Sequence, residues 1–251
     1  MLTLTAISTL FVLAVDLPQL PDPCTPRHRA RDRMLMISTE GVISARLDAT
    51  SFLITPTGQD RRSLGIEDLV LVRDCRRERG KRPSRSVCLH QAIYDRHPQI
   101  GSILTAQSPH VLAYAITPTC YDTKTIPESY ILLRDIPVVP YGAQFREPEQ
   151  VAASLSPDTP VLLIRNDCVL TTGATVLQAF DRLEVAELSA RSLLDTAAIG
   201  ALVPIGAREI EALDVVSVRL PVSFPAPRGS AAAASGAHAG APVRGSGLAG
   251  A

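Results

Sequence analysis

The strongest constraint on the fold is one long amphipathic segment in the second half of the chain. After Gly173, apolar residues recur every three or four positions along TVLQAFDRLEVAELSARSLL, at Leu177, Phe180, Leu183, Ala186, Ala190 and Leu193. This spacing predicts an α-helix with one apolar face. A helix of this kind gains most of its stability by packing that face against another layer of the protein.

The other apolar runs are short, and most of them are typical of β-strands. We predict strands over residues 42–47, 51–55, 69–72, 103–106, 161–165 and 168–171. Helical spacing recurs in residues 86–96, which Pro98 follows, and a short helix is predicted over 109–115. Because strands and helices mix without a strict alternation, the pattern favours an α/β sandwich over a barrel. Aromatic residues make up only 4% of the chain and Trp is absent, so the core must be aliphatic.

Composition divides the 251 residues into three parts. Residues 1–33 combine clustered prolines with a short basic run, and we expect a poorly ordered extension there. Residues 34–223 have the size of one domain. Residues 224–251 are mostly Ala, Gly, Ser and Pro, which predicts a disordered tail.

Charge and cysteine content exclude several classes of partner. The chain has 25 Lys and Arg residues against 25 Asp and Glu residues, so its charge gives no reason to expect nucleic acid or an anionic membrane surface as a partner. Its five cysteines are scattered without a C-x-x-C pair, which fits the reducing cytoplasm better than a disulfide framework. The apolar stretch near the start is too short to span a bilayer.

Five short motifs, taken in order, carry a resemblance to a known family. They are TEGVISAR at 39–46, FLITPTG at 52–58, EDLVLV at 67–72, PSRS at 83–86 with His90 four residues beyond, and LLIRND at 162–167 before a Thr-Gly pair. The set resembles the class II aldolase/adducin N-terminal domain family, which includes L-fuculose-phosphate aldolase. The resemblance implies a three-layer α/β/α sandwich with a mixed, mostly antiparallel central sheet. It also implies a homo-oligomer, a tetramer in the family's enzymes.

The same resemblance implies a metal site whose ligands differ in this chain. Active members hold zinc with three histidines, and these positions correspond here to Thr105, Gln107 and Asp167. The acid/base glutamate corresponds to Ser86, which cannot act as a carboxylate base near neutral pH. Hydroxyl and amide oxygens are weak zinc ligands. We therefore expect no metal cofactor and no acid/base catalysis by Ser86, as in a pseudoenzyme; zinc remains the alternative cofactor.

The family's phosphate-binding positions are retained better than its metal ligands. They correspond to Thr39, Gly41, Thr57 and Gly58 in two turns, and to Ser84 and Arg85 before the predicted helix. Arg85 replaces a second serine, and a guanidinium there would favour a phosphate or a carboxylate. The alternative is that Arg85 belongs to the solvated basic loop that precedes it.

These observations leave several functions open. The leading hypothesis is a class II aldolase-like protein without the zinc triad that binds a small anionic or sugar-phosphate-like ligand. The alternatives are an active metal-dependent aldehyde-lyase or epimerase, and a protein-interaction module as in adducin. A relocated metal site of Asp167, Cys168 and His110, and a recruited nucleophile at Ser86 or Cys168, are weaker possibilities. His90 is predicted to be a packed, hydrogen-bonded histidine rather than a ligand.

Overall fold

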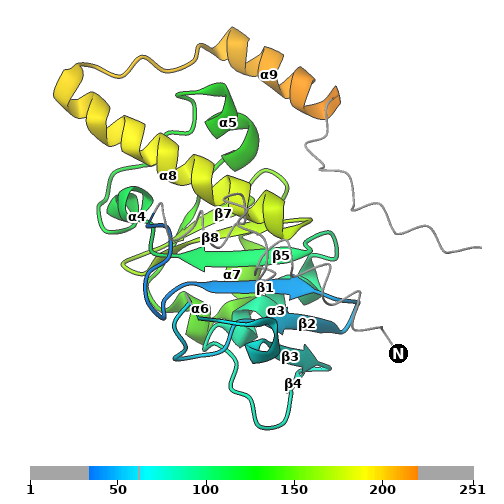
Figure 1. The fold of residues 1–251 in the computed structure, drawn as a ribbon. Coiled ribbons are helices and arrows are strands. Elements are labelled where there is room, and N and C mark those ends of the chain that lie inside the picture. The colour runs from blue at the N-terminus through cyan, green and yellow to red at the C-terminus, as the bar shows by residue number, and fades with distance from the viewer. Residues whose placement is uncertain (1–33, 62, 220–251) are drawn as a thin grey trace, which may run out of the picture.

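A computed structural model describes residues 34–61 and 63–219 of the chain. The predicted extension over 1–33 and the predicted tail over 224–251 lie outside the described residues, so both predictions stay untested. Between them, eight strands form one sheet in the order β4-β3-β2-β1-β5-β8-β7-β6 (Figure 1). All neighbouring pairs are antiparallel except β6 and β7.

Six of the eight strands follow the predicted apolar runs closely, and β4 and β6 were not predicted. They are β1 (Val42–Arg46), β2 (Ser51–Ile54), β3 (Val70–Arg73), β4 (Arg76–Arg77), β5 (Ser102–Ala106), β6 (Val138–Val139), β7 (Val161–Ile164) and β8 (Cys168–Gly173). Every residue of the central strands β5 and β8 is buried, because helices cover both faces of the sheet there. Thr105 lies opposite Val42 on one side and Leu170 on the other, which fixes the register of β5 in the sheet.

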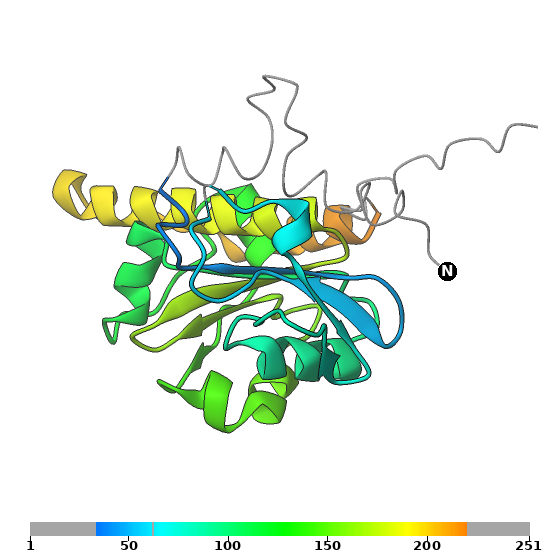
Figure 2. The ribbon, with the colours of Figure 1, turned by 60° about the horizontal axis from the view of Figure 1, so that its bottom comes forward.

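Helices form a layer on each face of the sheet, as Figure 2 shows with the sheet nearly edge-on. One layer contains α3 (Val87–Arg96), α6 (Ala143–Arg146) and α7 (Pro148–Ala153), which pack on one another. The other contains α4 (Pro109–Ala115), α5 (Pro127–Leu133) and the long α8 (Val176–Ile199). The three-layer sandwich with a mixed, mostly antiparallel sheet is confirmed.

Helix α8 confirms the amphipathic segment and extends it by five residues at its end. Its apolar face buries Phe180, Leu183, Ala186 and Ala190 in a cluster with residues of α4, α5 and the sheet. The Thr175 hydroxyl accepts a hydrogen bond from the Gln178 N–H and so caps the first turn. A final helix, α9 (Ala207–Arg219), contacts α5. The 3-10 helix η1 (Ile66–Asp68) follows the turns that border the cavity described below.

Candidate functional site

One cavity of about 250 Å³ opens where β1 begins and β5 ends. It is lined by all ten residues that the resemblance assigns to the phosphate-binding, acid/base and metal positions: Thr39, Gly41, Thr57, Gly58, Ser84, Arg85, Ser86, Thr105, Gln107 and Asp167. The chain brings them together from five separate segments, which are joined by the antiparallel pairing of β2 with β1, β1 with β5 and β5 with β8. Their roles as ligand contacts stay predictions.

Two glycine turns form the first wall of the cavity. Gly41 has φ +83°, and a Cβ added there would meet Met36 Cγ at 3.0 Å and the Thr105 carbonyl oxygen at 3.2 Å. Gly58 has φ +73°, but a Cβ there would meet nothing within 4 Å. Both turns need the left-handed backbone that glycine adopts without a steric penalty. At Gly41 a second reason favours glycine, because the Thr105 carbonyl of β5 leaves little room for a side chain.

Arg61 holds these turns in place, and the sequence analysis missed it. Its Nε donates to the Gly41 carbonyl at 2.9 Å, and its Nη1 donates to the Pro56 carbonyl at 3.2 Å. Burial lowers the pKa of Arg61, with the charges of Glu40 and Asp60 opposing that shift. Because its Nε and Nη1 both donate to backbone carbonyls, Arg61 is a positioning residue for the turns.

The second wall is the start of helix α3. The Ser84 hydroxyl is buried and accepts a hydrogen bond from the Ser86 N–H at 3.3 Å. Arg85 is exposed, and its guanidinium carbon lies 5.4 Å from the ring centre of Phe145 in α6, which is a cation–π distance. Within the described part of the chain, no hydrogen bond or ion pair joins Arg85 to another residue. Its donors therefore face the cavity without a protein acceptor.

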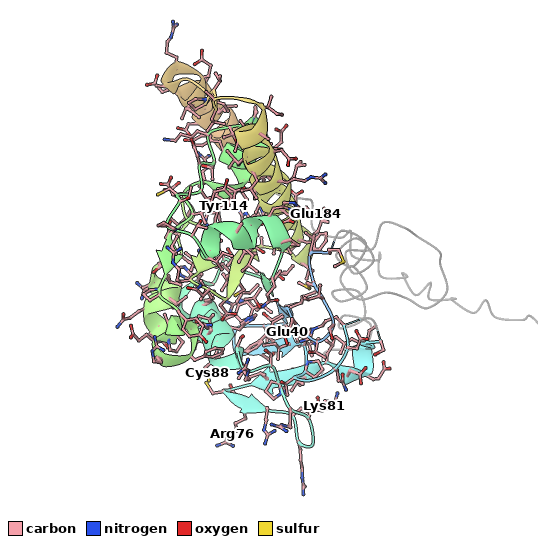
Figure 3. The ribbon with its side chains drawn as sticks, turned by 90° about the vertical axis from the view of Figure 1, so that its left-hand side faces the viewer. Glu40, Arg76, Lys81, Cys88, Tyr114 and Glu184 are labelled. Carbon is pink, nitrogen blue, oxygen red and sulfur yellow. The ribbon has the colours of Figure 1, made fainter. Side chains whose placement is uncertain are left out.

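The third wall contains the positions that the resemblance assigns to the metal ligands of the family's enzymes. Asp167 is half-buried and accepts a hydrogen bond from the Gln144 amide N–H. Burial raises the pKa of Asp167, the nearby Arg85 charge lowers it, and the charge of Glu40 raises it. Figure 3 shows Glu40 near the middle of the molecule, well away from Arg76 and Lys81 at the β4 end.

Two buried oxygens on this wall have no hydrogen-bond partner among the described residues. They are Oε1 of Gln107 and Oε1 of Gln144. Gln144 itself is 3% exposed, and both residues line the cavity. No sequence pattern marked Gln144 or Phe145, because they lie in a helix of four residues that is too short to show a period. Glu40 lies within the motif TEGVISAR, but its position in that motif did not predict that it lines the cavity.

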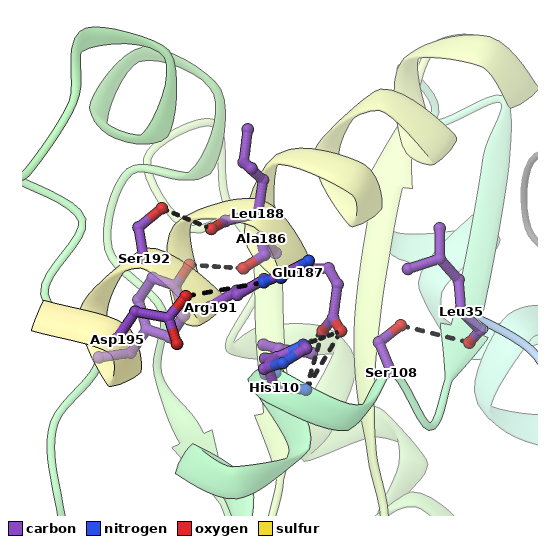
Figure 4. Close-up of polar contacts among 11 residues, drawn as sticks. Leu35, Ser108, His110, Ala186, Glu187, Leu188, Arg191, Ser192 and Asp195 are labelled. Atoms are coloured by element: carbon purple, nitrogen blue, oxygen red, sulfur yellow. Dashed lines mark hydrogen bonds and ion pairs between the residues drawn. The ribbon is translucent and has the colours of Figure 1, made fainter. Parts of the chain in front are cut away.

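Among the residues that the structure describes, the histidines do not assemble a second site. His110 lies outside the cavity, where its Nδ1 is 2.6 Å from Glu187 Oε1 (Figure 4). The relocated site of Asp167, Cys168 and His110 is therefore not formed. Within residues 34–61 and 63–219, no group of three or more His, Cys, Asp or Glu side chains is placed to hold a metal ion.

His90 is packed in the core, as predicted. Its side chain is fully buried, and its Nδ1 lies 2.7 Å from the Ser44 hydroxyl. Burial lowers the pKa of His90 to about 3, so the ring is neutral near neutral pH.

Cys168 borders the cavity but is poorly suited to act as a nucleophile. Burial raises the pKa of its thiol well above the ordinary value, and the charge of Asp167 raises it further. The thiolate is the reactive form of cysteine, so the thiol at this position is unreactive near neutral pH.

Among the helices that the structure describes, none combines the length and apolar character needed to cross a membrane.

Comparison with known proteins agrees with this architecture. The sequence profile described as Class II Aldolase and Adducin N-terminal domain matches residues 26–194. L-fuculose phosphate aldolase of Methanococcus vannielii is 26% identical over 161 residues, covering 64% of this chain and 87% of that protein. 3-oxo-tetronate 4-phosphate decarboxylase of Haemophilus influenzae is 28% identical over 175 residues, covering 64% of this chain and 79% of that protein.

A solved structure supports the same fold. YgbL of Klebsiella pneumoniae superposes with a TM-score of 0.67 at 24% identity, covering 75% of this chain and 93% of the other. The superposition therefore shows a shared fold. Since the family profile also spans most of the chain, the protein belongs to the class II aldolase and adducin N-terminal domain family.

Proposed function

We propose that this protein binds a small anionic metabolite in the cavity without a resident zinc ion. The observation that carries the proposal is Arg85, whose guanidinium borders the cavity with no hydrogen bond or ion pair to the described residues. The buried Ser84 and the turn at Thr57 and Gly58 border the same cavity. Hydroxyls, backbone N–H groups and a guanidinium together are well suited to a phosphate or a carboxylate.

The residues at the metal positions do not fit a zinc ion. Zinc sites are built from imidazole, thiolate or carboxylate ligands, and only Asp167 belongs to that set. One oxygen of its carboxylate already accepts the Gln144 N–H, which carries a partial positive charge. With Ser86 at the acid/base position, the pocket also lacks a carboxylate base there. These features favour ligand binding over the metal-dependent chemistry of the family's enzymes.

The names of the relatives suggest which anions to test first. L-fuculose phosphate and 3-oxo-tetronate 4-phosphate are phosphorylated small sugars or sugar acids. Sugar phosphates, inorganic phosphate and small carboxylates therefore form the first panel, with binding measured by thermal shift and by calorimetry.

Arg85→Ala is the central variant, and Arg82→Ala is its matched control. Arg82 is also an exposed arginine, three positions earlier, but it does not line the cavity. We expect Arg85→Ala to weaken phosphate binding about 10- to 100-fold, because hydrogen bonds to a charged group contribute about 1.5–3 kcal/mol. Arg82→Ala should bind like the wild type. Equal binding by all three proteins would refute the role of Arg85.

Metal analysis of the purified protein tests the second half of the proposal. We expect substoichiometric zinc and manganese in both the wild type and Asp167→Ala. Stoichiometric metal that is lost in Asp167→Ala would favour the metal-dependent lyase or epimerase instead.

A further inference from the structure

The wall of the cavity around Asp167 is unusually rich in hydrogen-bond acceptors. Gln107 and Gln144 each present a buried amide oxygen that has no partner among the described residues. The carboxylates of Asp167 and Glu40 line the same cavity. Leaving such acceptors buried and unpaired is costly, so they are expected to have a partner in the bound state.

The orientation of Gln144 follows from its neighbour. An ionised carboxylate can only accept hydrogen bonds, so the Gln144 amide must turn its N–H₂ group toward Asp167. This leaves its oxygen facing away from that carboxylate and still buried. One N–H of the Gln144 amide is therefore already committed to Asp167, and its oxygen is an acceptor without a partner among the described residues.

An ammonium group suits this wall better than other common ligand groups. It has three N–H donors and no acceptor, and its positive charge complements the two carboxylates. A hydroxyl has one donor and adds two lone pairs to a site that already has too many acceptors. A second phosphate or carboxylate would face Asp167 and Glu40 with the same sign of charge.

The second wall of the cavity has the reverse character, and its Arg85 charge is close enough to lower the pKa of Asp167. Arg85 contributes guanidinium donors there, next to Ser84 and the Gly58 turn. One cavity therefore holds a wall suited to an anion and a wall suited to a cation.

We propose that the ligand is a zwitterion that carries a primary ammonium group as well as a phosphate or carboxylate, with the ammonium group on the wall of Gln107, Gln144 and Asp167. This inference rests on the proposed function, since the anionic end of the ligand binds at Arg85. The ammonium group lies where the resemblance places the zinc ion of the family's enzymes, so the ligand itself supplies the positive charge at that position.

Matched pairs of ligands test the ammonium group separately from the anion. Phosphoethanolamine and 2-hydroxyethyl phosphate differ only in an ammonium group against a hydroxyl, and glucosamine 6-phosphate and glucose 6-phosphate form a longer pair. Calorimetry near neutral pH and at fixed ionic strength should give at least about tenfold tighter binding for the amine of at least one pair.

Two variants locate the effect in the cavity. Glu40→Gln is nearly isosteric and removes one negative charge, so it should reduce the preference for the amine to within about threefold while binding of the hydroxyl partner is unchanged. Arg85→Ala should weaken both members of a pair by a similar factor. Thermal unfolding of each variant, measured without ligand, establishes that the fold is intact.

The outcomes separate this inference from the proposed function. If both members of each pair bind equally and still depend on Arg85, the ammonium site is wrong and the anion site stands. A preference for the amine that persists unchanged in Glu40→Gln would also overturn the placement of the ammonium group. If no member of either pair binds at millimolar concentration, both proposals fail.

Discussion

Helix α3 contributes to two polar regions, one in the core and one at the cavity, which differ in their exposure to solvent. Its first turn lines the cavity through Ser86 and Leu89, and the next residue, His90, lies in the core. In the core, the Ser44 hydroxyl lies 2.7 Å from both His90 Nδ1 and the Tyr94 hydroxyl, while the buried His90 Nε2 has no partner among the described residues. In the cavity, the amide oxygens of Gln107 and Gln144 and the Arg85 guanidinium have no hydrogen-bond partner among the described residues.

The difference follows from the surroundings of each region. The His90 cluster is enclosed by the apolar layer between α3 and the sheet, where Phe52 packs 5.1 Å from the Tyr94 ring. Burial there lowers the pKa of His90 and raises that of Tyr94, so both groups stay neutral. The cavity retains an exposed arginine and a half-buried carboxylate. A polar group in the core therefore serves the fold, whereas the same kind of group at the sheet edge is available to a ligand.

The largest effect on the free energy of unfolding is expected when the pH is lowered. The pKa of His90 is about 3 in the folded protein, against 6.5 in the unfolded chain. Between these values the unfolded chain binds a proton that the folded protein excludes, so the free energy of unfolding falls as the pH is lowered. The loss is on the order of 5 kcal/mol across the whole window. Urea unfolding of the wild type and His90→Gln near pH 7 and pH 4 measures this contribution.

The control for this prediction is Tyr94→Phe. It removes a hydroxyl from the same cluster but leaves the titrating ring, so its dependence on pH should match that of the wild type. A wild-type curve and a His90→Gln curve of equal slope would show that His90 does not titrate in this range.

A smaller effect is expected from the two glycine turns. Alanine at Gly58 should cost about 1 kcal/mol of folding free energy for the left-handed backbone alone. Alanine at Gly41 should cost about 2–3 kcal/mol, because its Cβ also contacts Met36 and the Thr105 carbonyl at 3.0 and 3.2 Å. Urea midpoints of the two variants measure the difference. Equal losses would mean that the chain at Gly41 moves away from β5 at little cost.

The smallest effect is expected for chemical modification of the Cys168 thiol. Iodoacetamide near neutral pH should modify the exposed Cys75 and Cys88 in the folded protein and leave Cys168 as a free thiol, as peptide mass spectrometry would reveal. Labelling after unfolding in urea provides the control, since Cys168 should then react. Rapid modification of Cys168 in the folded state would return it to the set of possible nucleophiles.

The sequence was most informative where a single element was long or sharply patterned. The period of α8, the apolar strands β5 and β7, and the Pro-initiated α4 were predicted within a few residues. Helices α5, α6, α7 and α9 and the two-residue strands β4 and β6 were not predicted. Most of these elements are too short to show a period, and their positions depend on contacts with the layers around them.

The candidate site divides in the same way. The amino-acid sequence determined the turns at Gly41 and Gly58 and the residue types at positions 105, 107 and 167, because these are properties of residue type and local order. Only the tertiary structure decided that the Gln144 amide donates a hydrogen bond to Asp167 and that Arg61 donates one to the Gly41 carbonyl. Those contacts join segments that are far apart in the chain or shaped by irregular loops. No local pattern records them, because they arise when the sheet and its two helical layers close around the cavity.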